Sequence, residues 1–230
     1  MRRLVLLRHG ESAWNAEGRI QGQRCEGLSA LGREQAQVAA VALAAAHPEA
    51  SLVSSDLARC LETCEPLAER LRAEPIIDQR LRERSFGAWE GRLRAEVARD
   101  DAEHWARWLG GEDVVREVGG ESAGELADRI EPVWRELLER TPDQGVTIAV
   151  THGGPVWHGV HRLLGLRPGT LGGVSNASVT ELIAWEAGVG PGARAAAVVL
   201  DRWNETGHLP VELRTDWRPR AVSDAPPVGR

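Results

Sequence analysis

Two short segments of the chain place a histidine and then a glycine directly after an apolar run. Arg8, His9 and a glycine follow the run at residues 4–7, and His152 and a glycine follow the run at residues 146–150. Ligands in open α/β sheets bind at the carboxyl ends of the strands, so two parallel neighbours would bring both histidines to one edge. The planar guanidinium of an arginine can grip an anion through paired hydrogen bonds. The pattern therefore indicates a phosphate site.

A structural role is the alternative for each histidine taken alone, because isolated histidines are commonly surface or packing residues. Zinc binding is the competing function, and it would need a third ligand, often with two histidines close in sequence. His158 and His161 lie three residues apart on a predicted helix, but the sequence offers no obvious third ligand. The two matching strand ends thus favour phosphate chemistry with no metal and no other cofactor.

Short apolar runs alternate with longer segments of helical character, and these elements must position the two histidines. The sequence predicts strands at 4–7, 51–54, 75–78 and 146–150, and helices at 29–46, 57–71, 121–140 and 155–164. Ser29 and Asp56 are the candidate N-caps of the first two helices. Two late segments, 177–185 and 193–203, are joined by a glycine-rich stretch and predict a hairpin at the sheet edge.

This order of elements predicts an α/β fold, namely a three-layer α/β/α sandwich whose mostly parallel sheet has an antiparallel edge. Residues 79–120 break the alternation with charge-rich pieces and three tryptophans, and so long an insertion is typical of a functional lid. We expect one domain over residues 1–213, including this helical lid. Residues 214–230 are rich in Pro, Arg and Asp, and we expect them to form a disordered tail.

The composition narrows the possible partners. At 230 residues the chain can bury a substantial core, and its net charge of −6 argues against a nucleic-acid-binding protein. No apolar stretch approaches the length that crosses a membrane, and the first residues lack the features of a signal peptide. Three cysteines without paired spacing fit a reducing compartment, and Cys60 and Cys64 are predicted to be core residues on one helix face. We therefore expect a cytoplasmic protein.

A longer string of residues carries a resemblance to a known family. The chain resembles the histidine phosphatase superfamily, which contains cofactor-dependent phosphoglycerate mutases and many phosphomonoesterases. The resemblance rests on Arg8-His9-Gly10-Glu11-Ser12, Trp14-Asn15, Arg19-Ile20-Gln21-Gly22, Leu28-Ser29-Ala30-Leu31-Gly32, Arg59, the segment Leu81 to Gly91, His152, Ser175-Asn176-Ala177-Ser178 and Leu200 to Asn204.

The resemblance implies a role for each main residue. His9 is the residue that becomes phosphorylated, which splits one difficult displacement into two steps. Arg8 and Arg59 hold the phosphate, and His152 stabilises the charge on the transferring phosphoryl group. Glu83 lies where the family carries the general acid, which protonates the leaving group and later deprotonates water. Glu90 and Glu11 are the rival carboxylates, and Glu90 is expected to anchor the turn.

Four further residues correspond to phosphate or substrate contacts in the family. They are Asn15, Gln21, Gly22 and Gly153. A turn residue is the alternative interpretation of Asn15, and it is nearly as good.

The resemblance favours hydrolysis of a small-molecule phosphate ester. Family mutases hold a second phosphate with basic residues after the acid segment, whereas here the arginines of residues 92–120 are balanced by Glu and Asp. A mutase, a phosphohistidine-directed protein phosphatase and a phosphate-binding module without turnover are the alternatives. The end of the chain is similar to phosphatases that act on glucosyl-3-phosphoglycerate and related phosphosugars, and a broad-specificity phosphomonoesterase fits as well. The tryptophans could wall a sugar pocket or pack the lid. Because family members are often dimers, the resemblance also allows a homodimer.

Overall fold

The computed structural model of the chain describes residues 1–24, 26–185 and 197–215. Its centre is a six-stranded sheet in the order β3-β2-β4-β1-β5-β6. The first four strands in this order, β3 (Ile76–Ile77), β2 (Ser51–Ser54), β4 (Val146–Thr151) and β1 (Arg2–Arg8), are parallel. The strand β5 (Val179–Trp185) runs antiparallel to β1 and to β6 (Ala197–Glu205). The predicted parallel sheet with an antiparallel edge is confirmed.

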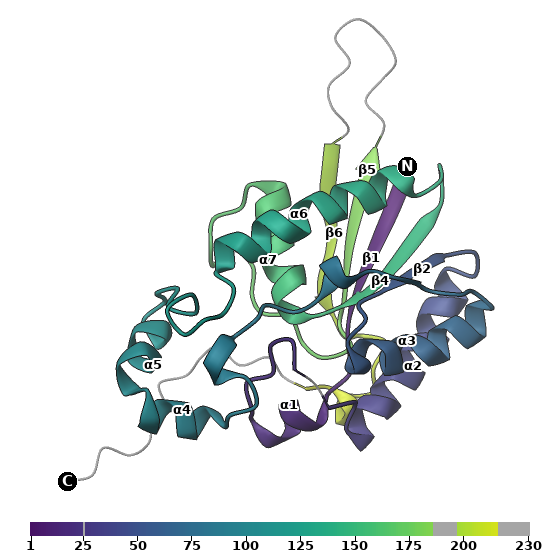
Figure 1. The fold of residues 1–230 in the computed structure, drawn as a ribbon. Coiled ribbons are helices and arrows are strands. Elements are labelled where there is room, and N and C mark those ends of the chain that lie inside the picture. Colours follow the sequence, from purple (N-terminus) through teal and green to yellow (C-terminus); the bar gives the residue numbers. More distant parts are fainter. Residues whose placement is uncertain (25, 186–196, 216–230) are drawn as a thin grey trace, which may run out of the picture.

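Two pairs of helices cover the two faces of the sheet (Figure 1). On one face lie α2 (Ala30–Ala46) and α3 (Ala58–Leu71), and on the other lie α6 (Ala123–Arg140) and α7 (Gly153–Leu164). Successive side chains of β1 alternate between the two cores: Leu4 and Leu6 pack on the α6 side, and Val5 and Leu7 on the α2 side. Burial on both faces explains why the strand reads as a continuous apolar run.

The predicted lid, residues 79–120, contains two short helices, α4 (Arg94–Asp100) and α5 (Ala102–Leu109), and 3₁₀ turns at Gln79–Leu81 and Gly87–Trp89. It has a small core of its own, in which Trp89, Trp105 and Trp108 pack edge to face or tilted against one another. All three tryptophans are buried. The idea that they line a sugar pocket is therefore wrong, and packing of the lid is the correct interpretation.

Local differences from the sequence prediction have identifiable causes. Asp56 does not cap α3: the N-cap is Leu57 without a side-chain bond, and the Asp56 carboxylate instead accepts hydrogen bonds from the Arg82 guanidinium. The segment at residues 11–28, where the sequence predicted neither helix nor strand, contains the helix α1 (Ala13–Glu17), which begins with a capping box of Ser12 and Asn15. Ser29 does cap α2, by accepting from the backbone N–H of residue 32.

Three further expectations concern the cysteines, the C-terminal segment and the crossing of a membrane. Cys60 and Cys64 are buried in the core beneath α3, as predicted, while Cys25 lies outside the described residues. A 3₁₀ turn at Val211–Leu213 leads to Arg214 and Thr215; the rest of the predicted tail and the hairpin tip at 186–196 also lie outside them. Among the helices described, none combines the length and the apolar character needed to cross a bilayer.

Candidate active site

The two strand-end histidines meet at the carboxyl edge of the sheet. β1 and β4 are direct parallel neighbours, with Arg8 opposite Thr151, and the backbone N–H of His9 donates to the Thr151 carbonyl at 2.9 Å. The ring centroids of His9 and His152 are 5.2 Å apart in an edge-to-face arrangement. Both side chains are buried. The structure thus brings together the pair that the sequence predicted.

The hydrogen bonds of His9 indicate which ring nitrogen keeps its lone pair. Nδ1 lies 2.6 Å from the Gly10 carbonyl oxygen, which can only accept, so Nδ1 carries the proton and Nε2 keeps its lone pair. Arg59 Nε donates to that Nε2 at 3.2 Å. Burial, followed by the charges of Arg59 and Arg8, holds the pKa of His9 well below its usual value. The imidazole is therefore kept neutral, as a nucleophile must be.

His152 is the opposite tautomer to His9: its Nε2 carries the proton and its Nδ1 accepts a hydrogen bond. Its Nδ1 accepts from Arg59 Nε at 3.1 Å, so the proton is on Nε2, which donates to Ser55 Oγ at 2.9 Å. Burial first, and then the charges of Arg59 and of its other neighbours, lower the pKa of this imidazole as well. A single guanidinium N–H is therefore shared between the two rings, and Nδ1 of His152 faces the space beside His9.

Two arginines make the centre an anion site. Arg59 is buried, and its other nitrogens donate to the carbonyls of Gly22 at 2.8 Å and Arg24 at 3.3 Å. Arg8 donates from Nη1 to the Val174 carbonyl, and its buried Nε has no hydrogen-bond partner among the described residues. Burial lowers the pKa of Arg8 to about 10, an effect that the nearby Glu83 partly offsets. Buried cations without a paired anion are costly, so the site is complementary to a phosphate group.

Glu83 faces this centre from the start of the lid. Its Oε2 accepts from the backbone N–H of Gly154 at 3.2 Å, in the first turn of α7, and its Oε1 accepts from the Arg84 N–H at 2.8 Å. The rival Glu90 instead holds its own turn, since Oε1 accepts from Phe86 N at 2.9 Å and from Ser85 Oγ at 3.1 Å. Glu11 Oε1 accepts from Ser29 Oγ at 2.8 Å. The carboxylate beside α7 is thus Glu83.

Three of the four remaining predicted contact residues lie in the segment at residues 11–28, and the fourth begins α7. Asn15 Oδ1 accepts from Asn176 Nδ2 at 3.2 Å, and Gln21 Oε1 accepts from Ser12 Oγ at 2.7 Å. Gly22 contributes its carbonyl to Arg59. Gly153 begins α7, and a Cβ built there would lie 3.5 Å from Arg8 Nε, so its backbone lies close to that guanidinium.

Sequence reasoning assigned no role to three side chains that support the centre. Ser55 accepts from His152, as above. Thr63, one turn after Arg59 on α3, accepts from the Gly10 N–H at 3.0 Å and donates to the Arg59 carbonyl at 2.6 Å. Asn176 donates to the His9 carbonyl at 3.3 Å. A helical spacing of four from Arg59 was the only available signal for Thr63.

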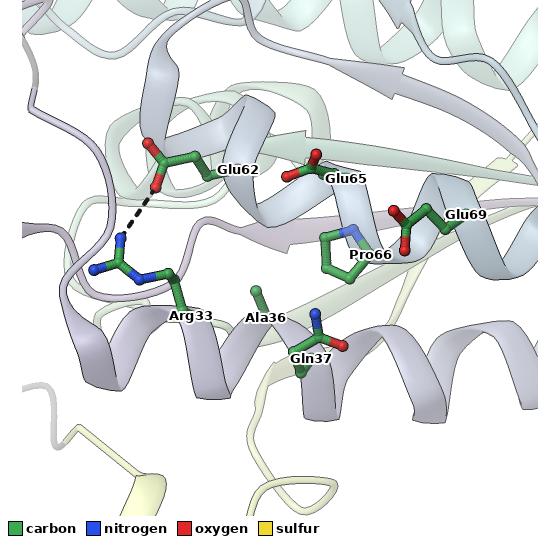
Figure 2. A pocket seen from close by; sticks show the side chains of 7 residues that line it. All are labelled: Arg33, Ala36, Gln37, Glu62, Glu65, Pro66 and Glu69. Carbon is green, nitrogen blue, oxygen red and sulfur yellow. Dashed lines mark ion pairs between the residues drawn. The ribbon is translucent and has the colours of Figure 1, made fainter.

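Two features of the described residues lie outside this site. No cluster of three or more His, Cys, Asp or Glu side chains able to hold a metal exists in the described part of the chain. His161 stacks on Trp157 with ring centroids 3.9 Å apart, and its Nδ1 bonds to the Trp157 carbonyl. A cavity of about 330 Å³ lies between α2 and α3 (Figure 2) and contains none of the predicted site residues. It is lined by Arg33, Ala36, Gln37, Glu62, Glu65, Pro66 and Glu69.

Comparisons with known proteins agree with this geometry. The family model of the histidine phosphatase superfamily (branch 1) matches residues 4–190. A glucosyl-3-phosphoglycerate phosphatase from Mycolicibacterium vanbaalenii is 41% identical over 91% of this chain and 97% of its own length. A probable phosphoglycerate mutase from Salmonella paratyphi A is 38% identical over 72% of this chain and 76% of its own. A solved mycobacterial glucosyl-3-phosphoglycerate phosphatase, in complex with VO3, has a TM-score of 0.77 at 34% identity and covers 90% and 100% of the two chains.

Proposed function

The chain belongs to the histidine phosphatase superfamily (branch 1), and we propose that it hydrolyses a phosphorylated glycerate such as glucosyl-3-phosphoglycerate through a phosphohistidine on His9. It is a phosphomonoesterase. The observation that carries the mechanism is the geometry of His9, whose unprotonated Nε2 faces Arg59 and lies beside His152.

In the first step, Nε2 of His9 attacks phosphorus and the bond from phosphorus to the ester oxygen breaks. The leaving oxygen takes its proton from the Glu83 carboxyl group. Arg59 exchanges its hydrogen bond to Nε2 for one to a phosphoryl oxygen, and Arg8 stabilises another. The bound phosphate anion favours protonation of His152 at Nδ1, because an opposite charge favours the charged form, and this N–H then donates to a further oxygen.

In the second step, water attacks the phosphohistidine and gives a proton to the Glu83 carboxylate. Cleavage of the phosphorus–nitrogen bond returns the lone pair to His9 Nε2 and releases inorganic phosphate. The net reaction is ester plus water to alcohol plus phosphate, and Glu83 ends protonated as it began. No step requires a group that the residues named above do not supply.

The charges of the lid support an acidic substrate with one phosphate. Between residues 92 and 120, four arginines are paired with carboxylates of the lid or of α6: Arg92 and Arg99 with Asp100, Arg107 with Glu112 and Glu117, and Arg116 with Glu125. Arg94 is exposed and forms no ion pair with any described residue, yet its charge adds to the effect of burial in lowering the pKa of Arg8. We assign Arg94 to the substrate carboxylate.

Mutase activity is the second candidate, supported by the Salmonella relative. A bisphosphorylated intermediate would need a second cluster of cations, and paired lid arginines are poorly suited to form one.

Two described cysteines, Cys60 and Cys64, are free thiols, which supports a cytoplasmic location. The homodimer stays a prediction.

The test is phosphate release from glucosyl-3-phosphoglycerate, 3-phosphoglycerate, sugar phosphates and p-nitrophenyl phosphate. His9→Ala should abolish release from every ester. Arg94→Ala should raise KM for the two carboxylate esters about tenfold, the loss of one charge-assisted hydrogen bond, and spare p-nitrophenyl phosphate. Arg99→Ala, on the same helix, is the matched control and should change neither. Interconversion of 2- and 3-phosphoglycerate with added bisphosphate, without release, would make the chain a mutase.

A further inference from the structure

Glu83 lies on a segment without regular secondary structure. Residues 82–86 belong to no helix or strand, and they connect the 3₁₀ turns at Gln79–Leu81 and Gly87–Trp89. Backbone ladders therefore do not fix the position of the acid. Contacts from other elements must do so, because a displacement of about 1 Å at a reacting group can cost about 100-fold in rate.

Arg129, on α6, supplies such contacts from outside the reacting centre. Its Nη1 donates to the carbonyls of Arg80 at 2.6 Å and Arg82 at 3.0 Å, and its Nη2 reaches the Glu83 carbonyl at 3.5 Å. One guanidinium thus contacts three carbonyls of the segment that carries the acid.

The same guanidinium is oriented by Glu121, which lies between the lid and α6. Arg129 Nε and Nη2 donate to the two oxygens of this carboxylate, each at 2.8 Å, in a bidentate pair. All five N–H donors of the arginine are then used. The pair is mostly screened from water, with 23% of the Arg129 side chain and 17% of the Glu121 side chain exposed. Such a planar pair is directional, so it fixes the guanidinium against the carbonyls.

We propose that Arg129, held by Glu121, is a positioning residue that sets the place of the general acid Glu83 relative to α7. The proposal rests on the proposed function, because it assigns Arg129 no role apart from that acid. Lysine cannot replace it: a single ammonium cannot reach three carbonyls and a carboxylate in one plane. Substitution of Arg129 should therefore weaken proton donation to the leaving group and leave phosphate binding unchanged.

The test compares two esters that differ in their need for the acid. p-Nitrophenyl phosphate has a leaving group of low pKa and needs little proton donation, whereas phenyl phosphate needs more. The quantity to compare is kcat/KM, because it reports the step up to phosphorylation of His9 and not the hydrolysis that both esters share. Arg129→Lys should lower kcat/KM for phenyl phosphate about tenfold or more and for p-nitrophenyl phosphate about threefold or less. The matched control is Arg135→Lys, on the same helix, where the arginine pairs with Glu131 at the surface. It should behave as wild type with both esters.

A double-mutant cycle separates positioning from general damage. In a Glu83→Gln background, Arg129→Lys should cause no further loss with phenyl phosphate, because it acts through the acid. Equal slowing of both esters, or an undiminished loss in the Glu83→Gln background, would overturn the proposal.

A second variant covers the case in which Arg129→Lys does not fold. Glu121→Gln keeps the arginine and the shape of its partner. It should lower kcat/KM for phenyl phosphate more than for p-nitrophenyl phosphate, by a smaller factor than Arg129→Lys does. An equal fall for both esters would again count against positioning. If wild type releases phosphate, His9→Ala abolishes the release, and Arg129→Lys slows both esters equally, then only this inference is refuted. No release by wild type would overturn the proposed function and the inference with it.

Discussion

Gly154 lies in the first turn of α7, against the carboxyl group that we assign as the acid. An ideal Cβ on this residue would lie 2.1 Å from Glu83 Oε1 and 3.1 Å from its Cδ. A carbon–oxygen contact normally requires about 3.3 Å, so Gly154→Ala must push the Glu83 oxygen away by about 1 Å. Because the atom that moves is the end of a flexible side chain, the cost in unfolding free energy should be small, about 1 kcal/mol.

The cost in catalysis should be much larger. A misplacement of about 1 Å corresponds to about 100-fold in rate, or about 2.7 kcal/mol of activation free energy. We expect kcat/KM, which reports only the step up to phosphorylation of His9, to fall by this order for phenyl phosphate and by far less for p-nitrophenyl phosphate, since the leaving group of the second ester needs little protonation. Steady-state phosphate release from both esters, with urea unfolding of each variant, measures the two effects separately.

The matched control is Gly124→Ala, at the same position in the first turn of α6. A Cβ there would meet only Ser122 Oγ, at 3.9 Å, so activity and stability should stay close to wild type. An unchanged kcat/KM for phenyl phosphate in Gly154→Ala, or an equal fall in kcat/KM for both esters, would refute the assignment of Glu83 as the acid at this place.

Three other outcomes follow from the same site. Ser55→Ala removes the acceptor of the His152 Nε2 proton, so kcat should fall about tenfold for both esters alike, and a loss confined to phenyl phosphate would argue against it. Because the pKa values of His9 and His152 are lowered from 6.5, the unfolded chain binds more protons than the folded chain below that pH. Stability should therefore be fully present above pH 6.5 and fall below it, by up to about 1.4 kcal/mol per pH unit for each imidazole. Urea unfolding of wild type and His152→Gln at pH 7 and pH 5 should show a shallower loss in the variant, and identical losses would contradict this. Treatment with EDTA should leave phosphate release unchanged, whereas a loss that zinc or magnesium restores would count against the mechanism.

Local patterns were sufficient for the parts of the fold that depend on neighbouring residues. The buried strands before His9 and His152 are short apolar runs that end in polar residues, and Ser29 is followed at once by a helical segment. The sequence predicts that the two histidines lie close together, because neighbouring parallel strands end at the same edge of the sheet. Fold class and the catalytic pair were therefore within reach of the sequence.

Contacts between distant segments were not within its reach. Asp56 has the right type and place for an N-cap, but Arg82, 26 residues further along the chain, takes its carboxylate. The sequence did not show whether the tryptophans of the lid face substrate or one another, because the same residue types occur in both cases. Arg129 reads as one charged residue on an amphipathic helix, and only the fold brings it to the carbonyls beside Glu83.

The most direct test of the account is the phosphoenzyme itself. Wild type should be mixed with p-nitrophenyl phosphate, quenched within milliseconds in alkali, in which a phosphohistidine survives, and mapped by peptide mass spectrometry. The account predicts one phosphoryl group on His9, with the label absent in His9→Ala and accumulating in a variant that is slow in the second step, such as Glu83→Gln. Hydrolysis by wild type without any label on His9, or with the label on another residue, would contradict it.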